Sequence, residues 1–384
     1  MRVAFVSHNS RAGGAEKAML ELIDGLREQG VVCSVLLRER GWLTGELSRR
    51  NLPFAIIPYR WWCSTRPYWK HRLPNLAALV MAIPVLGQLK RWEADIVLTN
   101  SSVVAVGALA ALLLGRPHIW YLHEFGKADH DLSFDLGINL ATKLMACLSA
   151  SIIVNSRALE AFYARRIPGS QLRMIYQAVN GVDLSASDRA LETGPASAPA
   201  RHKLVLVGGI AEGKGQTEAV QALGQLKTQG IQVELALVGT GEPAALERVK
   251  RAASDCGVEG LVNFTGQVAD PGPIVKDSDI ALICSRSEAF GRSTVEAMKL
   301  GKPVIGARGG ATPELIREGF NGLLYAPGDY LDLAEKIKLL IDNPGLAKQM
   351  GENGCRWAQE EFTMAKYVGK VLQVLREAVH QKEA

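Results

Sequence analysis

The sequence predicts an α/β protein made of two doubly wound domains. Short apolar segments of strand length alternate with amphipathic segments of helix length, which is the pattern of parallel strands connected by helices. Glycine-rich loops follow several of the predicted strands, and a stretch rich in alanine, serine and proline interrupts the alternation near the middle. A chain of 384 residues is long enough for about two to three domains, each with its own core.

The N-terminal domain begins with a βαβ unit. Residues 3–6 predict a strand, a loop containing Gly13 and Gly14 follows, and apolar residues then recur at helical spacing as far as Gly30. Residues 31–37 predict the next strand. The glycine pair lets the backbone approach a ligand or a neighbouring loop, but it is not the GxGxxG fingerprint of a dinucleotide site.

The segment from Pro58 to Trp92 differs in composition from the rest of the chain. It combines four tryptophans with six Lys and Arg residues and contains no acidic residue. Aromatic and basic residues beside a short apolar stretch are typical of contact with an anionic membrane surface. The alternative is a helix on the domain core whose exposed end is basic.

A histidine follows another predicted strand of this domain. Residues 118–122 form an apolar run, and His123 comes directly after it. The carboxyl ends of parallel strands are where such sheets bind ligands, so His123 is a candidate site residue. The alternative is a histidine held by hydrogen bonds within its loop.

Composition predicts the domain boundaries. Residues 186–200 consist mainly of Ala, Ser, Gly and Pro without apolar periodicity, as expected for a linker. We therefore expect an N-terminal domain over residues 1–185 and a second domain over residues 201–362. Residues 363–384 predict a final amphipathic helix.

The first loop of the second domain resembles a phosphate loop without being one. After the strand at residues 203–207, the sequence nearly spells GxxxxGK[ST], but Gly215 stands where a hydroxyl would bind magnesium and Glu212 would face the phosphates. A nucleotide triphosphatase is therefore excluded. Lys214 remains able to reach an anion at the strand end, unless it is simply a solvated lysine.

Residues 280–305 predict a strand, a loop, a helix and a second strand, with Glu288 in the loop and Glu296 in the helix. Ser293 or Thr294 is the expected N-cap. A helix start at the end of a parallel sheet is an anion site, and the two carboxylates suit the hydroxyl groups of the same ligand. Alternatively, Ser293 and Glu296 only form a capping box.

Charge and cysteine usage exclude several other functions. The net charge of +5 suits a phosphorylated ligand or an anionic membrane but is too small to predict nucleic-acid binding. The six cysteines form no CxxC or Cys/His cluster, and the Asp277-Ser278-Asp279 triplet precedes a strand, so no metal site is predicted. A strand starts at the N-terminus, no segment reaches about 18 apolar residues, and we expect a cytoplasmic protein, with peripheral association at the inner face of the membrane as the alternative.

These motifs together resemble the retaining GT-B glycosyltransferases of family 4. The E-x7-E signature of that family matches Glu288 and Glu296, followed by Gly301 and Pro303. Other family motifs match in order over nearly the whole chain, at Gly13-Gly14-Ala15-Glu16, His123, Asn180-Gly181-Val182-Asp183, Lys214-Gly215, Gly239-x-Gly241, Gly309-Gly310 and Asn321-Gly322. The resemblance implies two Rossmann-like domains facing across a cleft, with residues 363–384 packing back on the N-terminal domain.

The resemblance also implies a donor site for a nucleotide-diphosphate sugar. Lys214 would hold the diphosphate together with backbone N–H groups around Arg292, Ser293 and Thr294. Glu296 would accept hydrogen bonds from the ribose hydroxyls. No cofactor or metal is implied.

The catalytic residues implied by the family are Lys214, Glu288 and His123. Glu288 would lie beside the donor sugar, and His123 would face that sugar from the other domain. The loop that offers N–H groups to the sugar is Ala289, Phe290 and Gly291, and the residues that close over the phosphates are Gly13 and Gly14.

One departure from the family concerns diphosphate binding. Members often carry an arginine where this chain has Gly209, so binding would depend on Lys214, the helix start and Arg292. The expected activity is transfer of a sugar to a glycan or lipid-linked acceptor in cell-surface polysaccharide or glycolipid assembly. The alternatives are a nucleotide-sugar epimerase, a sugar phosphorylase, or a non-catalytic nucleotide-sugar-binding protein.

Overall fold

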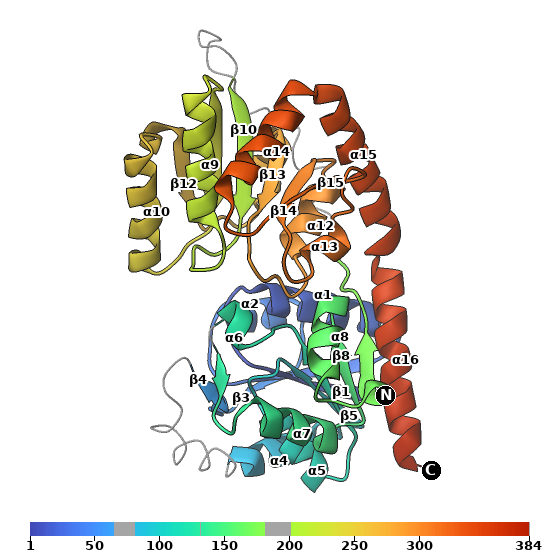
Figure 1. Cartoon of the computed structure of the whole chain (residues 1–384). Helices are drawn as coiled ribbons and strands as arrows, with labels where there is room; N and C mark the ends of the chain where they lie inside the picture. The colour runs from blue at the N-terminus through green and yellow to red at the C-terminus, as the bar shows by residue number, and fades with distance from the viewer. Residues whose placement is uncertain (65–80, 131, 181–200, 384) are drawn as a thin grey trace. The chain divides into compact units, whose positions relative to one another are not determined.

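The computed structural model describes residues 1–64, 81–130, 132–180 and 201–383. The chain forms two compact units, one made of Met1–Ala178 with Phe362–Ala384 and the other of Val179–Glu361 (Figure 1). The predicted linker at residues 186–200 lies outside the described residues. Within them, no helix is both long and apolar enough to cross a membrane.

The first unit contains a seven-stranded parallel sheet in the order β3-β2-β1-β5-β6-β8-β9. Its strands are β1 (Arg2–Ser7), β2 (Val32–Leu37), β3 (Phe54–Ile56), β5 (Ile96–Asn100), β6 (His118–Leu122), β8 (Ser151–Val154) and β9 (Leu172–Met174). A short antiparallel pair, β4 (Cys63–Ser64) with β7 (Ser133–Phe134), is separate from it. The chain order reverses between β1 and β5, which is the switch point where doubly wound sheets bind ligands.

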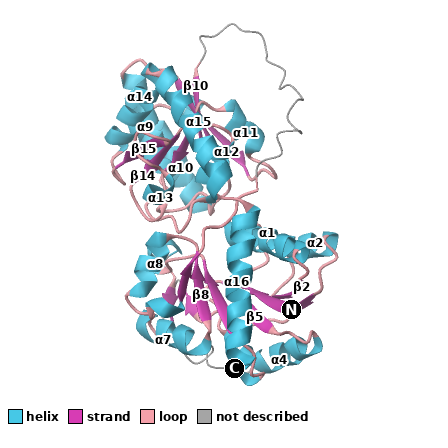
Figure 2. Cartoon of the chain, turned by 90° about the vertical axis from the view of Figure 1, so that its right-hand side faces the viewer, coloured by secondary structure: helices cyan, strands magenta, loops and turns pink. Residues whose placement is uncertain are grey.

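Helices cover both faces of this sheet. One layer contains α1 (Gly14–Glu28), α2 (Trp42–Arg49) and α16 (Met364–Glu383), and the other contains α4 (Ala82–Arg91), α5 (Val106–Leu113) and α7 (Ile138–Leu148). The described part of this unit also contains α6 (Lys127–His130), α8 (Arg157–Ala164) and the 3-10 turn Gly169–Gln171. Because α16 belongs to the first unit, the chain returns to this unit at its C-terminal end. Figure 2 shows α16 running along the sheet.

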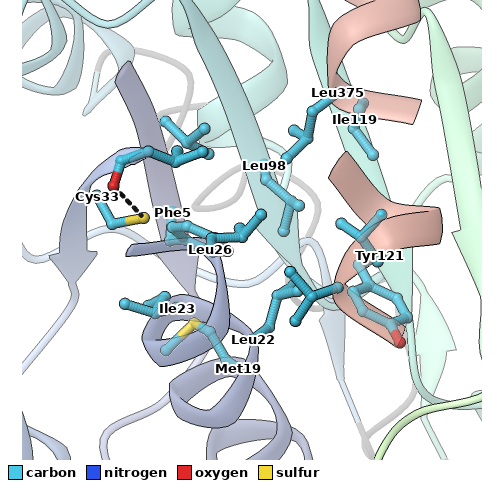
Figure 3. Packing of buried hydrophobic residues seen from close by; sticks show 14 of the residues in the cluster. Phe5, Met19, Leu22, Ile23, Leu26, Cys33, Leu98, Ile119, Tyr121 and Leu375 are labelled. Carbon is cyan, nitrogen blue, oxygen red and sulfur yellow. Dashed lines mark hydrogen bonds between the residues drawn. The ribbon is translucent and has the colours of Figure 1, made fainter. Parts of the chain in front are cut away.

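Because successive side chains of a strand point to opposite faces of the sheet, neighbouring residues pack against different helix layers. Phe5 and Leu98 belong to the apolar core that α1 and α16 complete, as Figure 3 shows with Leu26 and Leu375. The neighbouring residues Val6 and Thr99 point to the opposite face, where Gly107 of α5 packs so closely that a Cβ would lie less than 3.0 Å from the Thr99 hydroxyl oxygen.

The second unit contains a six-stranded parallel sheet in the order β12-β11-β10-β13-β14-β15. Its strands are β10 (His202–Val207), β11 (Val233–Val238), β12 (Val262–Gly266), β13 (Ile280–Ile283), β14 (Val304–Ala307) and β15 (Gly322–Tyr325). Its helices are α9 (Gln216–Thr228), α10 (Pro243–Asp255), α11 (Gly272–Asp277), α12 (Arg292–Lys299), α13 (Thr312–Leu315), α14 (Tyr330–Asp342) and α15 (Pro344–Glu361), with a 3-10 turn at Glu259–Leu261. Here the order reverses between β10 and β13. The predicted α/β class with two doubly wound sheets is confirmed.

Candidate functional site

In the second unit, two loops meet at the switch point of the sheet. Lys214 lies in the loop between β10 and α9, and Glu288 lies in the loop between β13 and α12. The Lys214 Nζ is 3.1 Å from the Glu288 Oε2, and the two side chains are 27% and 21% exposed. The structure therefore brings these two predicted catalytic residues into an ion pair that solvent still reaches.

Gly215 fixes how the lysine loop packs. Its φ of +74° lies in the left-handed region, and a Cβ at this position would lie less than 3.0 Å from the Cys284 carbonyl oxygen. A serine or threonine, as in a phosphate loop, has no room here. The glycine at position 215, which argued against a triphosphatase, is thus explained by packing against the Cys284 backbone.

The glycine pair Gly309–Gly310 supports the glutamate loop from the other side. A Cβ on Gly309 would lie less than 3.0 Å from the Arg286 carbonyl oxygen, and one on Gly310 equally close to the Glu288 backbone. The Ala311 N–H donates to the Glu288 carbonyl oxygen at 2.7 Å. The backbone of Glu288 is therefore held against the β14–α13 loop.

A buried carboxylate on α9, Glu218, joins the two loops through Arg286. The Arg286 N–H donates to the Gly213 carbonyl oxygen at 2.9 Å. The Arg286 Nε and Nη2 lie 3.2 and 3.1 Å from the Glu218 Oε1, while the Tyr325 hydroxyl and the Gly328 N–H donate to the Oε2 at 3.1 Å. Glu218 is 5% exposed, and its full set of partners offsets the cost of burying its charge.

Sequence reasoning missed Glu218, although a signal was present. Glu218 shares a helix face with Ala222 and Leu226, which are buried at the spacing of one and two turns. An acidic residue on an apolar helix face needs a partner, and this one pairs with Arg286.

Helix α12 begins earlier than predicted. Its N-cap is Gly291, with a φ of +97°, and Arg292 is the first helical residue, so the expected N-cap at Ser293 or Thr294 is wrong. Because Ser293 lies inside the first turn, no capping box forms with Glu296, which is the fifth helical residue. Gly291 takes the N-cap position because glycine readily adopts the left-handed conformation that this sharp loop-to-helix turn requires.

The other predicted residues of this loop differ in what they can offer. The Phe290 side chain is buried, so this residue can offer a ligand only its backbone, whereas Ala289 and Ser293 are half-buried. Thr294 is fully buried, and its hydroxyl oxygen has no hydrogen-bond partner among the described residues. The Arg292 Nε lies 3.9 Å from the Glu296 Oε1, which leaves the Glu296 carboxylate loosely held and 24% exposed.

In the first unit, His123 is engaged through both ring nitrogens. Its Nε2 lies 2.8 Å from the Asn100 Oδ1, and its Nδ1 lies 2.7 Å from the Gln177 Nε2. Each ring nitrogen of His123 therefore has an amide partner. His123 thus lies directly after β6, as predicted, but its ring is held by the amides of Asn100, at the end of β5, and Gln177, which follows β9.

Glu124 is the second functional candidate that sequence reasoning missed. Its Oε1 accepts hydrogen bonds of 2.6 Å from the Ser101 hydroxyl and from the Ser102 N–H and hydroxyl, and its Oε2 accepts the His123 N–H at 3.0 Å. Burial tends to raise the pKa of Glu124, but the charges of His8 and His123 and the two serine hydroxyls outweigh it. Its pKa therefore lies below the ordinary range, and an ionised carboxylate fixes the backbone of His123.

The predicted Gly13–Gly14 loop packs on another buried carboxylate. A Cβ on Gly13 would lie less than 3.0 Å from the Glu16 Oε2, and Glu16 is 1% exposed. Burial raises the pKa of Glu16, although His8, whose Nδ1 is 3.2 Å from the Glu16 Oε1, opposes that shift. Gly14 is exposed at the first position of α1.

Two tryptophans of the segment from Pro58 to Trp92 have partners inside the first unit. The Trp61 indole N–H donates to the His8 carbonyl oxygen at 2.8 Å, and the Trp62 indole N–H donates to the Ser102 carbonyl oxygen at 2.6 Å. The Trp62 ring also stacks on Trp120, with centroids 5.9 Å apart. Residues 65–80 of this segment lie outside the described residues.

The Asp277-Ser278-Asp279 triplet lies at the opposite edge of the second sheet. As predicted, it joins the end of α11 to the start of β13. Asp277 pairs with the Lys203 Nζ at 2.8 Å, and Asp279 accepts the Lys203 N–H at 2.8 Å. Among the described parts of the chain, no three His, Cys, Asp or Glu residues are grouped as a metal site would require.

The two units match two complementary family models. Residues 12–185 match the model "Glycosyltransferase Family 4", and residues 194–357 match "Glycosyl transferases group 1". The chain is a family 4 glycosyltransferase. The predicted family and the predicted GT-B fold are both confirmed.

Relatives extend this result over the whole chain. The lipopolysaccharide core biosynthesis glycosyltransferase LpsE of Rhizobium meliloti is 24% identical over 96% of this chain and 97% of its own length. The 2-deoxystreptamine glucosyltransferase of Streptomyces kanamyceticus is 27% identical over 78% of this chain and 81% of its own. Anabaena HepE, solved in complex with UDP, shares the fold with a TM-score of 0.81 at 22% identity, covering 98% of this chain and all of HepE.

Within this glycosyltransferase, the predicted site residues fall into two groups. Lys214, Glu288 and the following residues to Glu296 lie together in the second unit. In the first unit, Gly13 and Gly14 lie at the start of α1, and His123 follows the end of β6.

We expect Glu218→Gln to loosen both site loops. The amide keeps an acceptor for Arg286 but presents N–H groups to the Tyr325 hydroxyl and the Gly328 N–H, which are themselves donors. Hydrogen–deuterium exchange should become at least about tenfold faster in residues 211–216 and 285–291. Glu234→Gln, which breaks the exposed pair with Arg201, is the matched control. Unchanged exchange in both loops would contradict the positioning role of Glu218.

We expect Glu124→Gln to destabilise the protein most at neutral pH. The pKa of Glu124 is lowered by folding, so its contribution to stability is present above the unfolded pKa, near 4.5, and is lost as the pH falls below that. At pH 7 the substitution should cost roughly 2–4 kcal/mol, since charged hydrogen bonds in a buried site are lost.

Urea unfolding of the wild type, Glu124→Gln and the exposed control Glu28→Gln at neutral and acidic pH measures this. The raised pKa of Glu16 makes its contribution to the stability of the protein fall as the pH rises, opposite to that of Glu124. Because Glu16 is present in all three proteins, its contribution cancels when the variants are compared at the same pH. The prediction is contradicted if the difference in the free energy of unfolding between the wild type and Glu124→Gln stays constant or grows at acidic pH.

Proposed function

We propose that this chain is a retaining glycosyltransferase that moves a sugar from a nucleotide-diphosphate donor to an acceptor hydroxyl. The observation that carries the proposal is the Lys214–Glu288 pair at the switch point of the second sheet, beside the start of α12. A cation and a helix N-terminus suit a diphosphate, and a neighbouring carboxylate suits sugar hydroxyls.

The relatives support the choice of donor and pathway class. HepE was solved with UDP and with UDP-glucose, and LpsE is named for lipopolysaccharide core biosynthesis. A uridine diphosphate sugar is accordingly the first donor to test, and the acceptor is a glycan or a lipid-linked sugar of a cell-surface polysaccharide or glycolipid.

Donor binding exchanges one partner of Lys214 for another. Without donor, Glu288 neutralises the lysine; the diphosphate, with its larger negative charge, takes that place and releases Glu288 to accept hydrogen bonds from the sugar. Glu296 binds the ribose hydroxyls, which suits a carboxylate held only loosely by Arg292. The backbone N–H groups around Arg292 to Thr294 contact the phosphates, and those of Ala289 to Gly291 contact the sugar.

The transfer itself needs no nucleophile from the protein. The bond between the anomeric carbon and the diphosphate oxygen breaks, the acceptor oxygen bonds to the same face of that carbon, and its proton passes to the departing oxygen. Lys214 and the helix start stabilise the charge that develops on the diphosphate. His123, whose ring nitrogens both have amide partners, is given no proton-transfer role in this mechanism.

No metal ion is needed in this mechanism. Lys214, Arg292 and the N-terminus of α12 offset the charge of the diphosphate, which is the work that a divalent cation performs in other transferases.

A nucleotide-sugar panel tests the function. A donor that binds only the folded protein raises its melting temperature, and we expect a uridine diphosphate sugar to do so by several degrees, equally with and without EDTA. With acceptor extract, that donor should give a glycosylated product with the anomeric configuration of the donor, which NMR measures. A panel without any shift, or nucleotide release that requires added magnesium, would contradict the proposal.

We expect Lys214→Ala and Glu296→Ala each to lower turnover at least about a hundredfold, since one lost transition-state contact costs roughly 3–4 kcal/mol. The matched control is Lys203→Ala, which removes a lysine paired with Asp277 in the same unit. Circular dichroism checks folding. Normal turnover in either variant would remove that residue from the site.

A further inference from the structure

The helices on one face of the first sheet expose large apolar side chains. Ile83 on α4, Leu112 and Leu113 on α5 and Leu140 on α7 are 64, 58, 65 and 47% exposed, and Leu136 just before α7 is 44% exposed. Helix α5 contacts both α4 and α7, and Figure 1 shows the three close together at one end of this unit. We call these five residues with their three helices the α4–α5–α7 face.

The charges on this face have one sign. Helices α4, α5 and α7 contain no Asp or Glu, whereas Lys90, Arg91 and Lys143 are exposed on them and exposed Arg116 follows α5. The described acidic residues nearest to α4 and α7 in the chain are engaged elsewhere. Glu93 pairs with Arg2, Asp95 accepts the Arg2 N–H, and Asp135 is buried.

The helix layer on the opposite face of the same sheet, made of α1, α2 and α16, can be compared with the α4–α5–α7 face. None of the large exposed apolar residues among the described ones lies on α1, α2 or α16. Those helices also carry acidic residues along their length, namely Glu16, Glu21, Asp24, Glu28, Glu46, Glu377 and Glu383. The combination of exposed leucines with cations is thus specific to one layer.

We propose that the α4–α5–α7 face docks on an anionic lipid surface. Exposed leucine and isoleucine side chains enter the boundary between headgroups and acyl chains, and Lys90, Arg91, Arg116 and Lys143 pair with the lipid phosphates around them. The lack of acidic side chains matters because a carboxylate would be repelled by the same surface.

This surface differs from the one that composition alone indicated. Among the described residues of the segment from Pro58 to Trp92, the Trp61 and Trp62 side chains hydrogen-bond within the first unit, and α4 contributes to the face. The apolar contacts come chiefly from α5 and α7, which lie outside that segment. Docking here places an acceptor that is anchored in the membrane near the enzyme.

Sedimentation of the full chain with vesicles tests the proposal. We expect binding at low salt to phosphatidylcholine vesicles with about 30% phosphatidylglycerol, little binding to phosphatidylcholine alone, and release at about 1 M salt, where the screening length falls to roughly 3 Å. Leu113→Glu and Lys143→Glu should each lower the bound fraction by at least about fivefold. The control Leu339→Glu, at a 41% exposed leucine of α14 in the other unit, should bind like the wild type.

Three results would overturn the proposal. They are wild type that stays in the supernatant at low salt, Leu113→Glu that binds as well as the wild type, and equal binding to both kinds of vesicle. Light scattering without vesicles adds a fourth. A wild-type dimer that Leu113→Glu converts to a monomer would show that a second copy covers the face.

Discussion

The candidate site of the second unit depends on backbone packing against backbone at the switch point of the sheet. Gly215 lies on the carbonyl of Cys284, and Gly309 and Gly310 lie on the backbone of Arg286 and Glu288. Three loops from different strands can approach this closely only because no side chain separates them. The Lys214–Glu288 contact follows from that approach, so the glycines determine the geometry of the charged residues without touching a ligand.

Buried charges then hold the candidate residues of each unit in place. Glu218 ties Arg286 to α9 in the second unit, and Glu124 ties the backbone of His123 to Ser101 and Ser102 in the first. In both cases a carboxylate is removed from water but fully hydrogen-bonded, which is a costly arrangement unless every partner is present. This cost makes the two clusters rigid, because losing one partner leaves a charge uncompensated.

The sequence predicted the elements well for a physical reason. Strands of a parallel sheet are buried on both faces, so they read as continuous apolar runs such as the one that begins at Ile280, and the loops between them carry glycine. The proximity of Lys214 and Glu288 was also predictable, since carboxyl ends of parallel strands share one edge. Glu218 and Glu124 were not, because sequence pattern does not show which charged residue is buried or what it pairs with.

The start of α12 shows where local pattern and tertiary structure compete. Ser293 and Thr294 are better N-caps by side chain, yet the loop that places Glu288 beside Lys214 must turn sharply before the helix, and Gly291 alone supplies the left-handed backbone. The helix thereby gains two or three residues at its N-terminus, which places Glu296 farther from the helix start than predicted. A carboxylate in a capping box would neutralise the N–H groups of that helix start, whereas Glu296 in its observed position leaves them to an anion.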